Sequence, residues 1–494
     1  LPAAAAGEAV LKKETLRSFS YQWNVFSEMY EHWEENFWHN IKLSNPVNDF
    51  VELVSEKSIH LIFVSCTEDI FPVARTLLGA LYDVVGKSRP YVAVGGIFPT
   101  FAPALACELL GESADFIFKG EGETIVGDLC YRLENNKNVE DMPGLYMIGR
   151  RGEVINNSLP KPIDSTEATI PDYSLFDDSS FYRPMQGRLL RMLPVETHRG
   201  CPYKCAYCNS PSQNKIHDDD GLKFFRKSKM INVHNEIRSN IDRFKADSFY
   251  FWADTFFAWS SYEFDEFCEM YSEFRMPFWM QTRSETVRQD RMEKLQDLGL
   301  LRAAFGIEHG NEEFRKKILR RSVKNKSIID GLRIVTDMKI PVSVNNIMGF
   351  PTETRELVFD GIELNRHIHS DGINAYSFTP FHGTPLRDLG EKMGYVESGV
   401  LAQSFNQPTT LDMPQFSKAE IEGIRRCFVL YVKMPRFRWS EIEKAEKLTP
   451  EGDKLYRKLR KECRESFMSY SHENEDSEIN MEMNLPSYAR DSII

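Results

Sequence analysis

Apolar and polar residues alternate along this chain in two long series, and both series predict strands separated by helices. The first series predicts strands at residues 59–65, 91–96 and 114–120. The second predicts strands at residues 194–198, 248–252, 278–282, 302–307, 342–348 and 373–378, with helices at 230–245, 286–298 and 312–338. Strands that alternate with helices indicate parallel sheets. The pattern therefore predicts two α/β domains.

Other segments flank these two series. Aromatic residues recur every three or four positions between Phe19 and Ile41, which predicts an amphipathic helix that covers an apolar face of a neighbouring domain. Pro, Asp and Ser punctuate the segment between the series and predict a hairpin and a linker. Helical patterns at 417–434 and 450–470 precede a polar tail. The predicted divisions are an N-terminal segment, an α/β domain, a hairpin and linker, a second α/β domain and a helical C-terminal region, with bounds 1–46, 47–143, 144–190, 191–400 and 401–494.

The amino-acid composition favours some classes of protein over others. The chain has 494 residues, of which 42% are hydrophobic and 27% charged, as in large globular enzymes. No apolar run approaches the roughly 18 residues of a membrane span. A net charge of −12 argues against a general nucleic-acid surface, which needs a basic patch, and favours a small-molecule, peptide or lipid-like substrate. Six of the nine cysteines are scattered, and the start LPAAAAGEAV does not resemble a signal peptide, so a cytoplasmic protein is predicted.

The segment 199–208, RGCPYKCAYC, places Cys201, Cys205 and Cys208 in the spacing C-x3-C-x2-C. Three thiolates can hold three irons of a [4Fe–4S] cluster, whereas a structural cluster normally has four cysteine ligands. Three ligands leave one iron open to another molecule, in the way that a catalytic metal keeps an open position. The spacing therefore indicates chemistry at a cluster.

Other interpretations of the triplet remain open at this level. The three positions also fit one face of a buried helix, where cysteine behaves as a small hydrophobe, although Gly200 and Pro202 favour a loop. A zinc site needs a fourth ligand, and no second Cys or His pair follows His198 at the usual spacing. A non-catalytic iron–sulfur module would carry a fourth cysteine near the triplet, and the sequence has none there.

With Tyr207 directly before its third cysteine, the loop resembles the signature of the radical S-adenosylmethionine (SAM) superfamily. This resemblance implies that Cys201, Cys205 and Cys208 ligate a [4Fe–4S] cluster and that the open iron binds SAM. It also implies a one-electron donor such as flavodoxin or ferredoxin, whose electron cleaves SAM to a 5′-deoxyadenosyl radical. The expected fold is a partial (β/α)6 barrel, with its active site at the carboxyl ends of the strands.

Polar residues end the later predicted strands, where this family binds SAM. FGIEHG resembles the family's ribose-contacting segment and implies that Glu308 contacts SAM. Arg283 ends the third strand and can pair with the SAM carboxylate. Asp254 follows the second strand, where the family usually has Gly-Gly-Glu. Together with Tyr207, these residues form the predicted SAM site.

Four more polar residues near the strand ends carry weaker signals. MGFPTE resembles the family's fifth-strand motif, and Asn345 and Asn346 on that strand fit either SAM contacts or core amides. His309 and His382 are predicted to be structural. Segment 377–386 resembles the sixth-strand exit of cobalamin-type relatives, and it fits either a wall of the substrate cavity or a plain turn.

The first α/β series resembles the second half of the cobalamin-binding domain that precedes many radical SAM domains, through VGGIFPTFAP and ADFIFKGEGE. That resemblance implies that Ser65, Thr67, Gly95 and Gly96 line the pocket for the nucleotide tail of cobalamin. Two strand–helix units expected before residue 59 have no counterpart, and the loop D-x-H-x-x-G is absent from the sequence. A truncated domain of Rossmann-like (flavodoxin-like) type is therefore predicted in front of the barrel.

Together, the resemblances imply a radical SAM enzyme that uses SAM, a [4Fe–4S] cluster and cobalamin to methylate an unactivated carbon. The alternative is a radical SAM cyclase, oxidase or rearrangement enzyme without methyl transfer. A methylthiotransferase is disfavoured, because the sequence lacks a clear second cysteine triplet and a basic module after the barrel.

Overall fold

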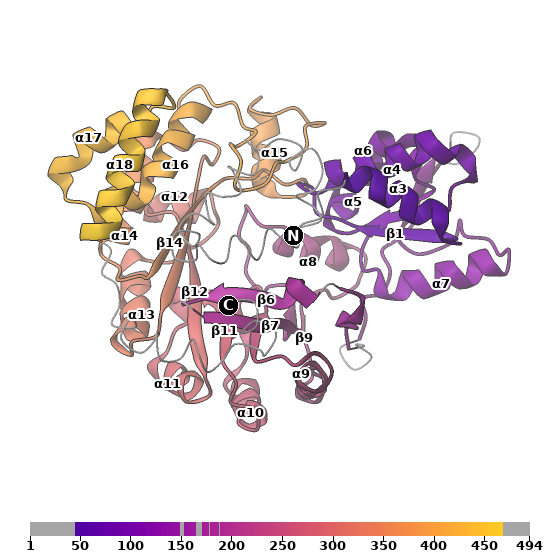
Figure 1. The fold of residues 1–494 in the computed structure, drawn as a ribbon, viewed down its shortest axis with the longest axis horizontal. Coiled ribbons are helices and arrows are strands. Elements are labelled where there is room, and N and C mark those ends of the chain that lie inside the picture. Colours follow the sequence, from indigo (N-terminus) through magenta and orange to yellow (C-terminus); the bar gives the residue numbers. More distant parts are fainter. Residues whose placement is uncertain (1–44, 149–152, 165–169, 177, 187, 468–494) are drawn as a thin grey trace, which may run out of the picture. The chain divides into compact units, whose positions relative to one another are not determined.

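A computed structural model describes residues 45–148, 153–164, 170–176, 178–186 and 188–467. The chain divides into two compact units between Pro162 and Ile163. Figure 1 shows the first unit in indigo to purple and the second from magenta to yellow. The predicted aromatic helix at 19–41, the turn of the hairpin at 150–152 and the polar C-terminal tail lie outside the described residues.

The first unit is an α/β domain, as its strand–helix alternation predicts. Its elements are α3 (Pro46–Glu56), β1 (Leu61–Ser65), α4 (Phe71–Val85), β2 (Tyr91–Gly95), α5 (Ile97–Phe101), α6 (Pro103–Leu110), β3 (Phe116–Phe118), α7 (Glu123–Glu134), β4 (Leu145–Ile148) and β5 (Val154–Asn156). The strands form one sheet in the order β1-β2-β3-β4-β5. The first three are parallel, and β4 and β5 form the predicted antiparallel hairpin.

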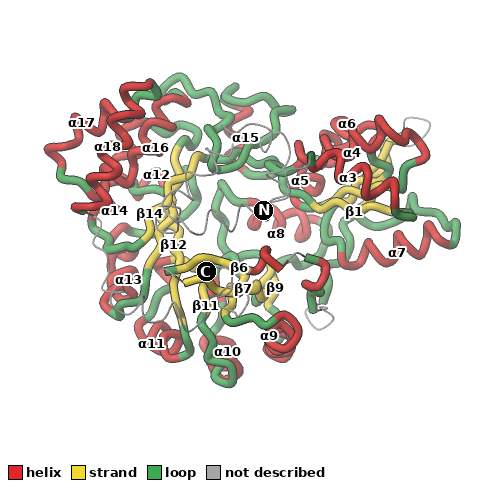
Figure 2. The backbone as a smooth tube through the Cα atoms, in the orientation of Figure 1, coloured by secondary structure: helices red, strands yellow, loops and turns green. Residues whose placement is uncertain are grey.

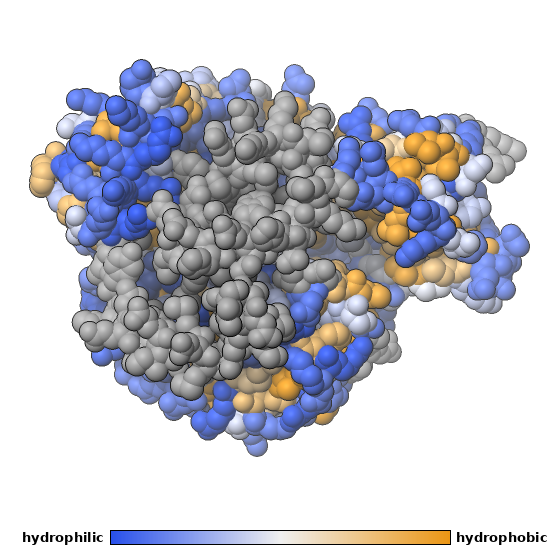
Figure 3. Space-filling model, viewed as in Figure 1, coloured by the Kyte–Doolittle hydropathy of each residue, from blue (hydrophilic) through white to orange (hydrophobic). Residues whose placement is uncertain are grey.

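Within the described residues, β1 pairs with β2 alone and is an edge of this sheet. A flavodoxin-like sheet has its topological switch point at such a strand, with further strands beyond it, and the described residues contain no strand beyond β1. Several large apolar side chains of this unit are partly exposed, among them Phe63 on β1 at 40% and Tyr91 on β2 at 50%. The space-filling view shows apolar surface on this unit between hydrophilic helices (Figure 3).

The second unit contains a longer series of strands and helices. Its elements are β6 (Tyr182–Met185), β7 (Arg188–Glu196), β8 (His198–Arg199), α8 (Asn209–Asp219), β9 (Arg226–Lys227), α9 (Met230–Phe244), β10 (Ser248–Trp252), α10 (Ser261–Tyr271), β11 (Phe278–Arg283), α11 (Gln289–Asp297), β12 (Leu300–Glu308), α12 (Glu312–Lys317), α13 (Asn325–Asp337), β13 (Val342–Met348), α14 (Arg355–Arg366), β14 (Gly372–Ser377), α15 (Pro385–Lys392), α16 (Lys418–Lys433), α17 (Trp439–Ala445) and α18 (Pro450–Ser466).

Seven strands of this unit form one sheet in the order β14-β13-β12-β11-β10-β7-β6. Six of them run parallel, and β6 is antiparallel to β7. Figure 2 shows the strands in yellow inside an arc of red helices that includes α9, α10, α11 and α13. This arrangement confirms the predicted partial (β/α)6 barrel.

Successive side chains of each strand lie on opposite faces of this sheet, and the two faces differ in polarity. Phe249 and Phe251 on β10, with Phe278 and Met280 on β11, are fully buried in the large core cluster under the outer helices. The residues between them face the concave side, because successive side chains in a strand point to opposite faces. The sheet thus has an apolar outer face and a more polar inner face.

The cysteine segment follows a short ribbon rather than the first barrel strand itself. The prediction of one strand at 194–198 was wrong at its end, because β7 stops at Glu196 and His198–Arg199 pairs separately with Arg226–Lys227. This ribbon carries the chain into the cysteine loop, and α8 follows at Asn209.

The single helix predicted at 312–338 is also wrong, because the segment forms α12 and α13 with an irregular stretch between them. Arg320 has a left-handed backbone with φ of 53°, which a helix interior does not accommodate. The apolar period continues through the break, since Leu319, Val323 and Ile328 are all buried. Periodicity alone therefore does not detect the interruption.

After the barrel, helices α16, α17 and α18 form the predicted helical region. Ser417 caps α16 in a reciprocal capping box with Glu420, which satisfies two backbone donors at its start. Leu430 and Tyr431 of α16, with Leu459 of α18, are buried in a second core cluster. Among the described helices, none has the length and apolar character needed to cross a membrane.

Candidate functional site

The cysteine loop lies at the carboxyl end of the parallel strands and is held by distant segments. The N–H of Ala206 donates to the Leu319 carbonyl at 3.0 Å, and the Ala206 carbonyl accepts from the N–H of Leu386 at 3.1 Å. The Asn209 side chain donates to the His382 carbonyl at 2.9 Å. Segment 377–386, predicted as either a cavity wall or a turn, therefore supports the loop.

Gly200 enters this loop with φ of +84°, and a Cβ there would lie 2.9 Å from the Phe224 ring. A side chain would meet both the steric penalty of positive φ and this contact. The Asn214 side chain donates to the Cys201 carbonyl at 2.6 Å and fixes the start of the loop from α8. These contacts define where the first thiol lies.

All three thiols of the loop are free and have nearby hydrogen-bond donors. The Tyr203 N–H donates to Cys201, and the Ser210 N–H in the first turn of α8 donates to Cys208. The Arg283 guanidinium donates to the sulfur of Cys205 at 3.3 Å. Donors of this kind stabilise thiolate ligands. The donor set therefore fits a negatively charged iron–sulfur cluster.

Burial nevertheless raises the pKa of Cys201 to about 11 and that of Cys208 to about 12. Within the described ranges, no three Cys, His, Asp or Glu side chains are close enough together to hold one metal ion. A [4Fe–4S] cluster does not require its ligands to converge on one ion, because each thiolate binds a separate iron.

His198 precedes the loop and is buried, with 2% of its surface exposed. Its Nδ1 lies 3.0 Å from the Thr197 hydroxyl, and its ring stacks on Phe225 and contacts Trp259. Burial, with a smaller contribution from Lys227, lowers the pKa of His198 to about 3. The folded protein therefore keeps this imidazole neutral.

We expect His198 to make the protein acid-sensitive. The unfolded chain binds a proton at His198 below its ordinary pKa of 6.5, whereas the folded protein does not until about pH 3, so stability falls as pH drops through this window. Each pH unit below 6.5 corresponds to about 1.4 kcal/mol, or about 3 kcal/mol by pH 4.5. Denaturant titrations of the wild type and of His198→Phe between these pH values will measure it. A parallel pH dependence in both proteins would contradict this role.

Arg283 joins the loop to the third barrel strand, and it lies beside the cysteines as predicted for a site residue. Besides its bond to Cys205, its guanidinium stacks over the Tyr203 ring at 3.8 Å. Its Nε donates to Glu285 at 2.7 Å. Burial opposes ionisation of Glu285, but Arg321 and Arg283 outweigh it and lower the pKa of this carboxyl.

Glu308 ends β12 with a left-handed backbone of φ 67°, a strained conformation for a residue with a side chain. Its carboxylate accepts from Arg321 at 3.2 Å and from the Tyr207 hydroxyl. Arg321 also donates to the Gly306 carbonyl at 2.6 Å. Burial raises the pKa of Glu308 against the opposing effect of Arg321. The predicted residues Tyr207 and Glu308 are thus in contact.

Arg321 is the residue of this site that sequence reasoning missed. It is 3% exposed and pairs with both Glu308 and Glu285, at 3.2 and 3.5 Å. Burial lowers its pKa, but Tyr207, Glu308 and Glu285 together raise it above its ordinary value. The break between α12 and α13 places Arg321 at the site. Apolar residues continue across that break, so the sequence predicted one continuous helix and did not indicate a role for Arg321.

His309 connects the ends of β12 and β13, as the prediction of a structural role implies. Its Nε2 lies 3.0 Å from the buried Glu353 carboxylate, and its Nδ1 accepts from the Asn311 N–H at 3.0 Å. Accepting at Nδ1 places the proton of the neutral ring on Nε2. Glu353 also accepts from the backbone N–H groups of Gly349 and Phe350. This pair joins GIEHG to MGFPTE.

Asp254 follows β10 and accepts from the Ser210 hydroxyl at 2.5 Å, so it lies beside Cys208 at the start of α8. Desolvation raises the pKa of Asp254 against the effect of Ser210. Asn346 is a satisfied core amide that exchanges hydrogen bonds with Asn365 at 3.2 and 2.7 Å. Asn345 accepts from the Asn374 side chain at 2.9 Å.

In the first unit, Ser65, Thr67, Gly95 and Gly96 lie together at the carboxyl edge of the parallel strands. Ser65 pairs in register with Gly95, and Ser65 and Thr67 are exposed. Gly96 has φ of +101°, and a Cβ there would lie 2.6 Å from the Cys66 backbone and 3.1 Å from the Ser65 hydroxyl. Glycine at 96 therefore permits the close packing of this turn against the Cys66 backbone.

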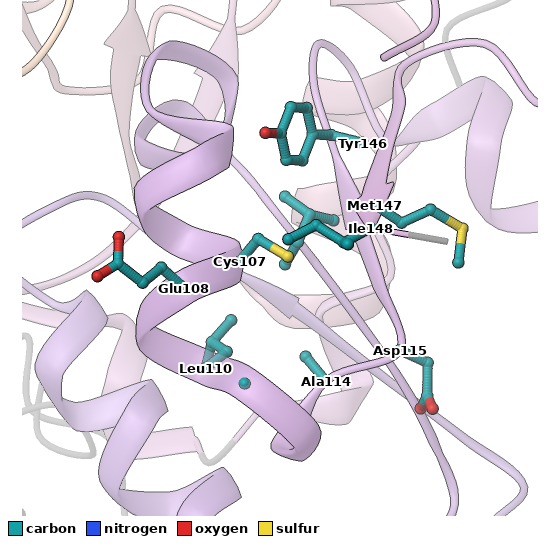
Figure 4. Close-up of a pocket in the computed structure, with 10 residues that line it drawn as sticks. Cys107, Glu108, Leu110, Ala114, Asp115, Tyr146, Met147 and Ile148 are labelled. Carbon is teal, nitrogen blue, oxygen red and sulfur yellow. The ribbon is translucent and has the colours of Figure 1, made fainter. Parts of the chain in front are cut away.

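A separate cavity of about 320 Å³ lies in the first unit between α6 and β4 (Figure 4). Cys107, Leu110, Ile117, Tyr146 and Ile148 are among its mainly apolar lining. None of the four residues predicted to bind cobalamin lines this cavity. It is therefore distinct from the carboxyl edge of the sheet.

Residues 195–360 match the Radical SAM superfamily. An uncharacterized methyltransferase of Pyrococcus horikoshii is 22% identical over 420 residues, which cover 81% of this chain and 85% of that protein. An anaerobic magnesium-protoporphyrin IX monomethyl ester cyclase of Cereibacter sphaeroides is 23% identical over 384 residues, covering 74% of this chain. This chain spans 58% of the cyclase.

Solved structures show the same fold. The structure of the radical SAM methyltransferase TsrM from Kitasatospora setae, with tryptophan substrate and a SAM analog bound, superposes with a TM-score of 0.61 at 14% identity and covers 85% of this chain and 91% of TsrM. The cobalamin-dependent SAM radical enzyme OxsB, with aqua-cobalamin and SAM bound, gives 0.59 at 16% identity and covers 85% of this chain and 64% of OxsB. Both comparisons span the two units described above.

Proposed function

We propose that this chain, which belongs to the radical SAM superfamily through residues 195–360, is a cobalamin-dependent methyltransferase that acts on an unactivated carbon. The observation that carries the proposal is the cysteine loop, whose three thiols are free, whose Cys205 accepts from Arg283, and which lies near the Tyr207–Glu308–Arg321 network at the strand ends. The α/β unit in front of the barrel, and the methyltransferases among the similar proteins, support the methyl-transfer part.

The residues of the loop and the strand ends have separate roles in this proposal. When bound, the cluster, SAM and cobalamin supply a one-electron cleavage, a hydrogen-abstracting radical and a methyl group. Cys201, Cys205 and Cys208 hold the cluster, and Arg283 balances the charge on Cys205. Glu308 and Asp254 accept hydrogen bonds from the hydroxyl and amino groups of SAM, and Tyr207 and Arg321 orient Glu308.

The first unit binds the nucleotide tail of cobalamin in this proposal. Ser65 and Thr67 offer exposed hydroxyls, and Gly95 and Gly96 form the turn beside them, where Gly96 packs against the Cys66 backbone. The described sheet has three parallel strands, and its carboxyl edge provides these groups.

We expect Ser65→Ala to weaken cobalamin binding about tenfold, since one hydrogen bond to a bound ligand contributes about 1.5 kcal/mol. Equilibrium dialysis of hydroxocobalamin against the full chain will measure the affinity. Thr76→Ala on α4 is the matched control, because its exposed hydroxyl bonds only to the Pro72 carbonyl in its own helix. Equal affinities for both variants would contradict the assignment of this edge.

The alternative is a radical SAM reaction without methyl transfer, and the similarity to a cyclase favours it as the second candidate. Reduced, anaerobically reconstituted protein should be assayed for 5′-deoxyadenosine and for S-adenosylhomocysteine, with and without cobalamin. Both products, the second dependent on cobalamin, support methyl transfer. Deoxyadenosine alone supports the alternative, and neither product excludes both.

The proposal includes a one-electron donor such as flavodoxin or ferredoxin and a reducing, cytoplasmic location. All nine cysteines are free, which is compatible with that location. Reconstituted enzyme with either protein donor, compared with dithionite, will test the electron source. Reduction by dithionite without turnover with either donor would contradict the choice of donor.

A further inference from the structure

Three aromatic rings gather on the concave face of the barrel sheet. Tyr250 and Trp252 lie on β10, and Trp279 lies on β11. The Tyr250 ring centroid is 4.1 Å from that of Trp279 and 5.5 Å from that of Trp252. Tyr250 and Trp279 are paired directly across the two strands. We call these three residues the aromatic wall.

The aromatic wall is not part of the protein core. The neighbouring residues Phe249, Phe251 and Phe278 point to the opposite face and are fully buried under the outer helices. The three rings of the wall do not belong to that cluster, and Trp252 has 54% of its surface exposed. A large exposed ring on a rigid strand, inside a barrel, is typical of a surface that meets a ligand.

One step beyond Trp279 on the inner face, the other strands carry small residues. Gln281 of β11 is in register with Ala304, Ala304 with Ser343, and Ser343 with Gly372. At the level of Trp279 itself, the neighbouring residue is Arg302. The three strands beyond β11 therefore carry little side-chain volume at the level of Gln281. This asymmetry suits a flat group that lies against the rings.

The wall also leads directly to the predicted SAM site. Along the inner face, Trp252 is two residues from Asp254, and Trp279 is four residues from Arg283, which contacts Cys205. Two residues of a strand span about 6.6 Å. A ring on the wall would therefore present its edge to the SAM-binding level.

Charges of both signs lie near the wall. Glu196 pairs in register with Trp252, and Asp254 follows two residues later. Arg199 neutralises Glu196 through two hydrogen bonds, at 2.9 and 2.8 Å. Arg302 of β12 is in register with Trp279. These charges therefore do not set the charge of a ring bound at the wall.

We propose that the aromatic wall binds a planar aromatic ring of the substrate by stacking. This inference rests on the proposed function, because it names the substrate class of the same site. Trp252 is the specificity-determining residue, since its face is the most accessible of the three. A flat ring against it keeps dispersion contacts that a puckered saturated ring loses.

The experiment uses reconstituted enzyme with SAM and measures the binding of two probes by equilibrium dialysis. The probes are 2-naphthamide and its fully saturated decahydro analogue. We expect the flat amide to bind about tenfold more tightly than the saturated one. Trp252→Leu should remove this preference, and Trp252→Phe should retain most of it. Tyr262→Leu, at a ring on α10 that is 78% exposed, is the control and should change nothing.

Equal binding of the flat and saturated probes, or a preference that persists in Trp252→Leu, would overturn the inference. So would a matching loss of SAM affinity in Trp252→Leu, because the ring would then serve SAM. Circular dichroism and the binding of Trp252→Phe show whether the variants fold. Deoxyadenosine formation by the wild type tests the proposed function separately, since its absence would leave the ring preference measurable.

Discussion

Replacing Cys201, Cys205 or Cys208 by Ala should abolish both cluster binding and deoxyadenosine formation. Removing a group that only orients a metal ligand costs about 10-fold to 100-fold in activity, and removing the ligand itself costs more. Cys205→Ala has a second consequence, because it also leaves the Arg283 guanidinium without the sulfur that lies 3.3 Å away. Iron and sulfide content, the visible spectrum and 5′-deoxyadenosine yield after anaerobic reconstitution measure these losses.

Cys130→Ala is the control for these variants. Cys130 is an exposed free cysteine of the first unit, and a side chain that takes no part in the cluster should be replaceable without loss. If all three loop variants retained iron and sulfide as the wild type does, the cluster would have other ligands, and the proposed function would fail.

Arg321→Met should destabilise the protein by about 3–5 kcal/mol, because it removes the arginine that pairs with Glu308, whose side chain is 11% exposed, and one of the two arginines that pair with Glu285. Without Arg321, the pKa of Glu308 should rise further, since burial already raises it and Arg321 opposes that rise. A protonated Glu308 accepts fewer hydrogen bonds from SAM, so SAM affinity should fall as well. Denaturant unfolding and equilibrium binding of SAM to the reconstituted enzyme measure the two effects.

The neighbouring arginine provides a matched control for this variant. Arg320 is exposed, and its substitution by Met should change stability by less than about 0.5 kcal/mol. Arg321→Lys separates charge from shape, because lysine restores the charge without the guanidinium fork that reaches two carboxylates and the Gly306 carbonyl. Unchanged stability of Arg321→Met would show that the network does not need this cation.

The amino-acid sequence alone determined the α/β class and the cluster loop. The barrel strands are short runs rich in apolar residues between helical segments, so their positions could be predicted within a few residues, and β10 and β13 have the predicted bounds. The three cysteines lie within eight consecutive positions, so their chemistry depends on local spacing. Short-range signals of this kind need no knowledge of the fold.

The tertiary structure alone decided which distant residues complete the site. Arg321 meets Glu308 and Glu285 only because the chain breaks between α12 and α13, and the continuous apolar period there predicted one helix. Trp252 and Trp279 look like ordinary strand aromatics in the sequence, and only the pairing of β10 with β11 places them on the concave face. Long-range pairing depends on the energy of the whole packed sheet, which no local pattern of residues records.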